Sequence, residues 1–211
     1  MRKTKALVMT FLVAVLLCMT NYVFAGTDEV GIFLTGDAAG WNGGPKGASY
    51  AALIFDKLGY RNVRGSGYYT VNTKAEVLDY IRNGSKHYGF YYNGHAYSNG
   101  MNVNSQTNGA DAILYNEITG NWHLVFLDGC STAATDQLAN AFKIVGYSNR
   151  LFIGWYKTVN SYDAGEWNEA FYNHVGTTNL RSAALAAVDD VINLNTPIRM
   201  YGDKNWYGWA W

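Results

Sequence analysis

Short apolar runs alternate with amphipathic segments along this chain of 211 residues, and no other feature of the sequence constrains the fold as strongly. The runs have the length and the aliphatic and aromatic content of buried strands. Between them, apolar residues recur at helical spacing, as in the segment 51–58. Strands that alternate with helices predict an α/β domain, here a three-layer αβα sandwich with a mostly parallel central sheet. The strands expected to be parallel and adjacent are residues 30–35, 88–93, 122–128 and 151–159.

Local signals add further expectations. Thr73 and Glu76 form a capping box that predicts the start of a helix. Residues 119–121, Thr-Gly-Asn, stand between the apolar runs 112–118 and 122–128, and this arrangement predicts a β-hairpin. A flavodoxin-like strand order is the alternative topology, and it would also keep strands 88–93 and 122–128 side by side.

The first residues have the layout of a secretory signal peptide. Three basic residues precede an apolar stretch at 6–18, and small residues then lead up to Ala25. We expect a signal peptide at residues 1–25 and a single mature domain at residues 26–211, so the protein is expected to be secreted. A retained N-terminal anchor is the alternative. No later segment has the length and apolarity of a membrane span, so no membrane association is expected after cleavage.

Charge and motif content exclude several function classes. Removal of the signal peptide removes three basic residues, so the mature chain has 13 Lys and Arg against 16 Asp and Glu. It also has no run of basic residues, which argues against a nucleic-acid partner. No histidine pair has the spacing of a zinc site, so no metal is expected. The glycine-rich loop 36–47 is not a phosphate-binding P-loop, because Gly47 follows Lys46 where Ser or Thr is required. No cofactor is therefore expected.

The cysteine count points to one residue. Cys18 lies within the predicted signal peptide, which leaves Cys130 alone in the mature chain and without an intramolecular disulfide. Such a cysteine can be a buried inert thiol, half of an intermolecular bridge, or a nucleophile.

Two predicted strands end in reactive side chains. The run 88–93 leads into Gly94-His95, and the run 122–128 leads into Gly129-Cys130. Ligands of parallel sheets bind at the carboxyl ends of the strands, so neighbouring strands would bring a thiol and its base together. A helix expected directly after Cys130 would favour the thiolate, and backbone N–H groups at the strand ends can hold an oxyanion. The other histidines are expected elsewhere: His87 and His123 away from this edge, and His174 in the core.

These motifs carry a family resemblance. An apolar strand ending in Tyr-Asn-Gly-His-Ala (92–96), then one ending in Phe-Leu-Asp-Gly-Cys-Ser-Thr-Ala (126–133), resembles the caspase-fold cysteine peptidases: metacaspases, clostripain and gingipains. The resemblance implies a caspase-like fold, with His95 as general base and Cys130 as nucleophile. It also implies an oxyanion hole of backbone N–H groups, here assigned to Gly94, Ala96 and Cys130. The family usually has glycine after the histidine, where this sequence has Ala96.

Asp128 and Trp155 are the candidate substrate-binding residues. Side chains alternate along a strand, so Asp128 should emerge on the same side as Cys130 and attract a cationic side chain, with a bidentate contact for Arg. Metacaspases and clostripain carry an aspartate at this place and cut after Arg or Lys. Alternatively, Asp128 bonds backbone N–H groups of the Asp-Gly turn. Trp155 is expected in the sheet, on a strand that borders the substrate groove in the resembling families. Asp37 or Asp163 can also share the pocket.

The sequence thus favours a secreted cysteine endopeptidase that acts on peptide or protein substrates, after Arg or Lys. A non-catalytic caspase-fold protein that binds glycan or protein through its aromatic residues is the second hypothesis. Acyl chemistry on a non-peptide substrate by the same dyad is the third.

Overall fold

The computed structural model describes residues 28–65, 67–83, 87–103, 111–191, 194 and 197–209. The predicted signal peptide therefore lies outside the described residues. Within them, no helix is long and apolar enough to cross a membrane.

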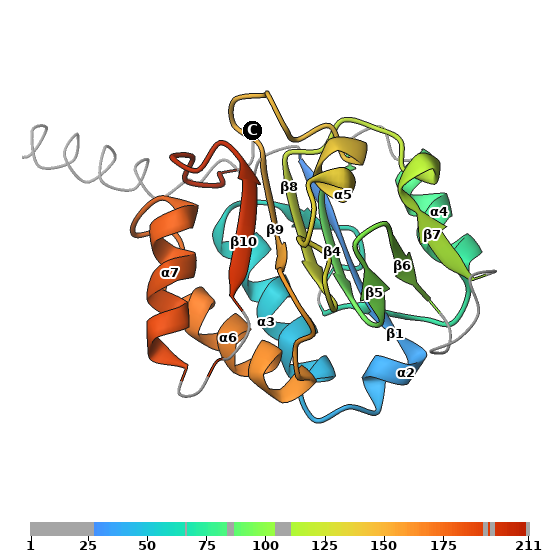
Figure 1. Cartoon of the computed structure of the whole chain (residues 1–211), viewed down its shortest axis with the longest axis horizontal. Coiled ribbons are helices and arrows are strands. Elements are labelled where there is room, and N and C mark those ends of the chain that lie inside the picture. Colours follow the sequence, from blue (N-terminus) through green and yellow to red (C-terminus); the bar gives the residue numbers. More distant parts are fainter. Residues whose placement is uncertain are drawn as a thin grey trace, which may run out of the picture.

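A seven-stranded sheet forms the middle layer (Figure 1). The strands lie in the order β10-β9-β8-β4-β1-β2, and β3 also pairs with β1. All pairs are parallel except that of β10 with β9. The expected set of adjacent parallel strands is therefore confirmed. The strands are β1 (Glu29–Thr35), β2 (Arg61–Asn62), β3 (Tyr69–Val71), β4 (His87–Asn93), β8 (Leu124–Asp128), β9 (Leu151–Trp155) and β10 (Ile198–Gly202).

Helices cover both faces of the sheet, as the αβα prediction requires (Figure 1). One core lies between the sheet and the helices α3, α6 and α7, and it takes alternate strand residues such as Ile32, Phe126 and Ile153. The other core lies against α4 and α5 and takes the intervening residues, such as Phe90 and Val125. This alternation is the two-residue period of a strand that is buried on both faces. The helices are α2 (Gly36–Ala39), α3 (Gly44–Lys57), α4 (Lys74–Asn83), α5 (Gln137–Ala141), α6 (Ser161–His174) and α7 (Leu180–Asp190).

The chain between β4 and β8 forms a small second sheet over one end of the molecule. Its strands are β5 (Ala96–Tyr97), β6 (Gly100–Asn102) and β7 (Ala112–Leu114), all antiparallel, followed by the 3-10 turn Tyr115–Glu117. The hairpin expected around residues 119–121 is therefore wrong. The run 112–118 enters the small sheet and ends in a turn, whereas β8 pairs in parallel with β4 in the large one.

Capping chemistry explains where α4 begins. The Glu76 carboxylate accepts bonds from the backbone N–H groups of Asn72 and Thr73 and from the Thr73 hydroxyl, at 2.8–3.0 Å. These bonds satisfy donors that the first helical turn leaves without partners. They also hold the pKa of Glu76 below its ordinary value.

Candidate active site

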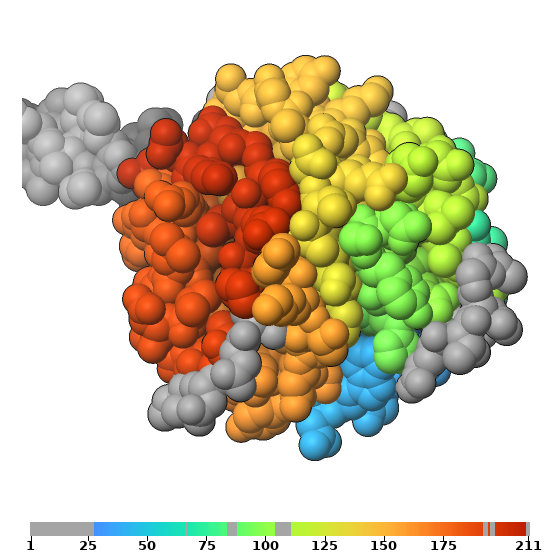
Figure 2. Space-filling model, viewed as in Figure 1, coloured from blue at the N-terminus to red at the C-terminus, as the bar shows by residue number. Residues whose placement is uncertain are grey.

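The predicted site lies where the parallel strands end. β4 and β8 are neighbours whose last residues, Asn93 and Asp128, are register partners, so the segments that follow both strands leave the sheet together. They border a pocket of about 330 Å³ that also takes the segments after β1 and β9, and Figure 2 shows these four segments meeting at the lower edge of the molecule. The pocket is lined by Trp41, Asn93, Gly94, His95, Asp128, Gly129, Cys130, Thr158, Val159, Ser161 and Ala164.

Gly129 allows the two strand ends to approach closely. A Cβ at this position would lie 2.6 Å from the carbonyl oxygen of Gly94 and 2.7 Å from the Cβ of Ala96. Neither contact is tolerable, so only glycine lets the chain pass beside the histidine segment. Ala96 itself belongs to strand β5 and pairs with Met101, so its backbone does not need glycine. The departure at Ala96 therefore leaves the local backbone regular.

The Cys130 thiol is half-buried and points to the neighbouring loop. Its Sγ donates to the carbonyl oxygen of Val159 at 3.7 Å. Within the described residues, no hydrogen bond joins it to His95. The next residue, Ser131, has a φ of 59°, which is uncommon for a residue with a side chain and marks a sharp turn after the nucleophile candidate.

The helix expected directly after Cys130 does not begin there. α5 starts at Gln137 and has only five residues, so its N-terminus is too far along the chain to act on the thiol. Thr132, in the turn that follows Cys130, is buried. Its Oγ1 lies 3.0 Å from the carbonyl oxygen of Leu127 and accepts a bond from the N–H of Trp155. These bonds connect the turn to β8 and β9.

His95 is held by the backbone around it. Its carbonyl oxygen accepts bonds from the N–H of Asn102 and from the hydroxyl of Tyr92, at 2.8 and 3.1 Å. Its imidazole meets the ring of Trp41 edge to face, with the ring centroids 4.8 Å apart. Trp41 was not identified from the sequence, although a lone tryptophan in a glycine-rich loop is a signal that the loop packs against something.

Backbone N–H groups near both residues were expected to form an oxyanion hole. The N–H of Cys130 has no acceptor within the described residues, whereas that of the next residue, Ser131, donates to the carbonyl oxygen of Lys157. The N–H of Gly94 makes a long bond, 3.5 Å, to the carbonyl oxygen of Asp128. Of the Gly94 and Cys130 N–H groups, that of Cys130 is therefore the one without a competing acceptor among the described residues.

Asp128 lines the bottom of the pocket and is only 3% exposed. Its Oδ2 accepts bonds from the Tyr91 hydroxyl and from the amide groups of Asn93 and Asn168, at 2.8–3.0 Å. Its Oδ1 accepts one bond, from the indole N–H of Trp155 at 2.7 Å. These donors are side chains, not the backbone groups of the Asp-Gly turn. Burial raises the pKa of the Asp128 carboxyl, and the four donors act in the opposite direction.

Trp155 does not line the pocket, contrary to its expected contact with substrate. Its indole is fully buried between the sheet and α6, because it packs on Trp167 and its N–H is used by Asp128. Asp37 and Asp163 are also absent from the lining of this pocket.

The remaining histidines lie elsewhere. His123 precedes β8 at the opposite end of the sheet and bonds Asp28 at 3.0 Å. His174, expected in the core, is instead partly exposed at the end of α6, where it pairs with Asp190 at 2.7 Å. The side chain of His87 lies outside the described set.

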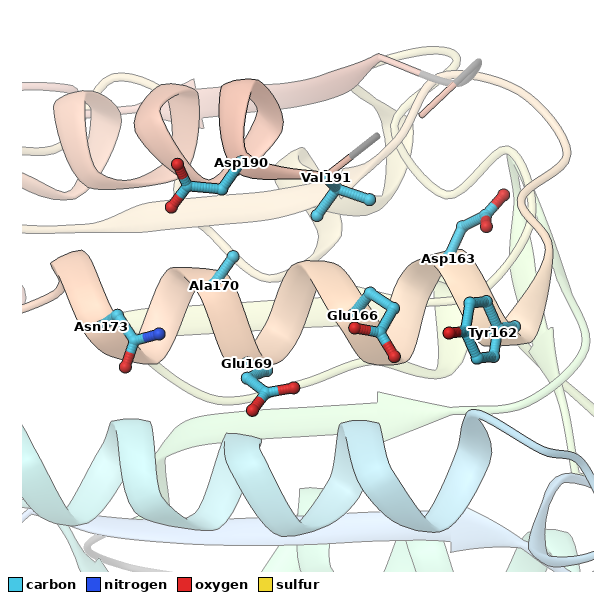
Figure 3. Close-up of a pocket in the computed structure, with 8 residues that line it drawn as sticks. All are labelled: Tyr162, Asp163, Glu166, Glu169, Ala170, Asn173, Asp190 and Val191. Carbon is cyan, nitrogen blue, oxygen red and sulfur yellow. The ribbon is translucent and has the colours of Figure 1, made fainter. Parts of the chain in front are cut away.

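A second hollow, of about 480 Å³, lies beside α6 and the end of α7 (Figure 3). Asp163, Glu166, Glu169 and Asp190 make it acidic. Lys46 contacts both Glu166 and Glu169 at 2.6 Å. It contains no nucleophile, and the described residues contain no group of His, Cys, Asp and Glu that could hold a metal ion.

Comparison with known proteins places the fold. No protein-family model matches the sequence, and no curated protein matches it. Among solved structures, the complex of the pro- and mature domains of Porphyromonas gingivalis RgpB matches with a TM-score of 0.55 and 12% identity, over 87% of this chain and 48% of that one. The chain has the caspase-like fold.

Two further solved structures agree. The Arg-specific cysteine proteinase gingipain R (RgpB) has a TM-score of 0.50 and 11% identity, over 86% of this chain and 47% of that one. A structure described only as a protease has a TM-score of 0.52 and 14% identity, over 84% and 47%. The chain therefore spans about half the length of the structures that it matches.

Proposed function

We propose that this protein is a secreted cysteine endopeptidase, with Cys130 as its nucleophile and His95 as its general base. The observation that carries the proposal is the position of both residues on one pocket, directly after the adjacent parallel strands β4 and β8. The basic and apolar N-terminal segment supports export.

In the proposed reaction, His95 takes the proton from Cys130 Sγ, and the thiolate attacks the carbonyl carbon of the scissile bond. The N–H of Cys130 stabilises the negative charge that develops on the carbonyl oxygen. The C–N bond then breaks as His95 gives its proton to the departing amine, which leaves a thioester on Cys130. Water hydrolyses this thioester and regenerates the thiol. The thiol has to turn from Val159 toward His95 first, because its hydrogen bond in the structure goes to Val159.

We further propose that the pocket takes a basic side chain, because Asp128 lies at its bottom and no Lys or Arg among the described residues forms an ion pair with it. The proposal favours Lys over Arg. Oδ2 already accepts three bonds, and only Oδ1 has acceptor capacity left. A single ammonium contact can use that position, whereas a bidentate Arg contact needs both oxygens.

Labelling with a peptide-based electrophile tests the peptidase proposal. A peptidyl chloromethyl ketone with Lys next to the reactive carbon should label the wild type at Cys130, as peptide mapping by mass spectrometry would show. Cys130→Ala should abolish labelling and peptide cleavage, and His95→Gln should lower the cleavage rate by about 100-fold or more. Cleavage that survives Cys130→Ala would reject the nucleophile. Fluorogenic peptides that differ only in Lys, Arg, Glu or Leu at the cleavage position test the preference, and equal rates on all of them would reject a role for Asp128 in specificity.

A non-catalytic binding protein is the second candidate. The contact of the Cys130 thiol with Val159 favours it, because the thiol is paired with a carbonyl rather than with a base. This candidate predicts that the Lys peptide binds the pocket with the same affinity in the wild type and in Cys130→Ala, without cleavage or labelling. The labelling experiment therefore separates the two functions.

A further inference from the structure

Trp41 is an aromatic residue of the pocket to which neither the motifs nor the proposed reaction assigns a role. It lies between α2 and α3, lines the pocket, and meets the His95 ring edge to face with the centroids 4.8 Å apart. Aromatic rings attract one another in this geometry, because the positive edge of one faces the negative face of the other. The contact therefore favours particular orientations of the imidazole.

In the part of the chain that the structure describes, no hydrogen-bond partner orients the imidazole of His95. Within the described residues, neither ring nitrogen makes a hydrogen bond or an ion pair. A catalytic base usually receives such a bond, which sets the direction of the ring toward the nucleophile. Here the ring contact with Trp41 occupies the place of that bond.

The segment that carries Trp41 is fixed against α6. A Cβ on Gly43 would lie 1.6 Å from the carbonyl oxygen of Ser161, and one on Gly165 would lie 2.9 Å from the carbonyl oxygen of Gly43. The N–H of Trp41 donates to the carbonyl oxygen of Ala38 at 3.1 Å, and its ring packs on the core beneath α3 and α6. The close contact between the backbone at Gly43 and that of α6 thus fixes the segment that carries the indole. The indole can therefore restrict the orientation of the imidazole.

We propose that Trp41 is a positioning residue, which holds the His95 imidazole in the orientation needed to take the proton of Cys130. This inference rests on the proposed function, because it assumes that His95 serves Cys130 as a base. This role differs from substrate binding, because Trp41 would orient His95, and through it affect the reactivity of the Cys130 thiol, even when no peptide is present.

The test is a double-mutant cycle on the alkylation of Cys130 by iodoacetamide, which requires no peptide substrate. The variants are Trp41→Leu, His95→Gln and the double variant, measured from about pH 5 to about pH 9. Leu keeps apolar volume but has no ring. Trp41→Leu should slow alkylation near neutral pH by roughly tenfold and move its pH profile toward that of His95→Gln. In the His95→Gln background it should have no further effect, because the two residues act as one unit.

Trp41→Phe should keep most of the wild-type rate, because it restores a ring. Trp209→Leu is the matched control, since Trp209 is exposed and does not line the pocket. Melting temperatures should show that each variant is folded, and Trp41→Met replaces Trp41→Leu if the latter is not. Equal effects of Trp41→Leu in both backgrounds, or a wild-type rate no faster than that of His95→Gln, would overturn the inference.

Peptide cleavage by the same variants separates the two proposals. Trp41→Leu should lower kcat by roughly tenfold while KM changes less. A coupled cycle without any peptide cleavage would keep Trp41 as a positioning residue and reject the peptidase. Cleavage together with additive effects would keep the peptidase and reject the role of Trp41.

Discussion

The Asp128 side chain accepts more hydrogen bonds than that of either proposed catalytic residue, His95 or Cys130. Its four donors come from β4, β9 and α6: Tyr91, Asn93, Trp155 and Asn168. α3 also approaches it, because a Cβ on Gly47 would lie 3.1 Å from Oδ2. A buried carboxylate that accepts bonds from several elements holds those elements together. If one of them moved away, its donor would be buried without a hydrogen-bond partner, which costs free energy. The same residue is thus part of the scaffold and the bottom of the pocket.

Asp128→Asn should lower the free energy of unfolding by about 1–3 kcal/mol, because an amide N–H₂ would replace one acceptor and face a donor. Trp155 cannot adapt, since its indole N–H only donates. Urea denaturation measures the loss. Asp163→Asn is the matched control because that carboxylate lies in the second hollow. An Asp128→Asn protein as stable as the wild type would contradict the anchoring role.

Gly129→Ala should disturb the site more than the rest of the fold. The added Cβ would press on Gly94 and Ala96, and backbone cannot give way as a flexible side chain can. We expect a loss of about 1–3 kcal/mol in stability and a strong decrease in Cys130 labelling. Ala96→Gly should leave both nearly unchanged, because Ala96 lies in a regular strand. Comparable effects of the two substitutions would be inconsistent with this geometry.

Among the elements, β1 and β8 are tied together at the end of the sheet opposite the site. β4 lies between them, yet Asp28 and His123 span it with a 3.0 Å contact, and the His123 ring stacks on Tyr88 at 4.5 Å. Burial lowers the pKa of His123, although Asp28 acts in the opposite direction. His123 therefore binds a proton less readily in the folded protein than in the unfolded chain.

This shift predicts how stability depends on pH. The unfolded chain binds a proton at His123 near the ordinary value of about 6.5, and the folded protein binds it only at lower pH. The contribution is therefore fully present above about pH 6.5 and is lost as the pH falls through the folded-state pKa. Urea denaturation from about pH 5 to about pH 8 should show this loss, and His123→Gln should remove it.

Periodicity was sufficient for the strands that continue through the core and insufficient for short elements. The runs that became β1, β4, β8 and β9 were found because both of their faces are buried. The pattern at 112–128 was misread, because a local turn signal does not tell which sheet the flanking runs join. α5 was predicted too close to Cys130, since the apolar spacing after it is satisfied by a five-residue helix and turns.

The candidate site could be predicted in part for the same reason. His95 and Cys130 follow long strands, so the α/β topology alone brought them to one edge. Trp41 and Asn168 come from segments whose position depends on the contact between α3 and α6, and no local pattern encodes that contact. The donors of Asp128 were not predicted, because they lie on β4, β9 and α6, three segments far apart in sequence.

At the scale of the whole molecule, two separate cores meet on one sheet, and the pocket lies where the sheet ends. The α3, α6 and α7 side holds Asp128 and its donors, whereas the small sheet β5–β7 on the other side carries the hairpin that begins at His95. The carboxylate of the pocket and the segment that follows His95 are thus supported by different cores of the protein.

Binding of a cationic ligand in the pocket should therefore raise the melting temperature of the protein. Folding buries the Asp128 carboxylate without a Lys or Arg partner among the described residues, and a cation that reaches it offsets part of that electrostatic cost in the folded state alone. Nα-acetyl-lysine amide at about ten times its dissociation constant should stabilise the Cys130→Ala protein by about 1.4 kcal/mol, a rise of a few degrees in Tm. Nα-acetyl-norleucine amide, which has nearly the same shape and no charge, should give a smaller rise at the same concentration. Identical shifts with both compounds, or the same shift in Asp128→Asn, would show that the carboxylate does not sense the ligand. If the prediction holds, thermal melting can identify cationic ligands of the pocket before any substrate is known.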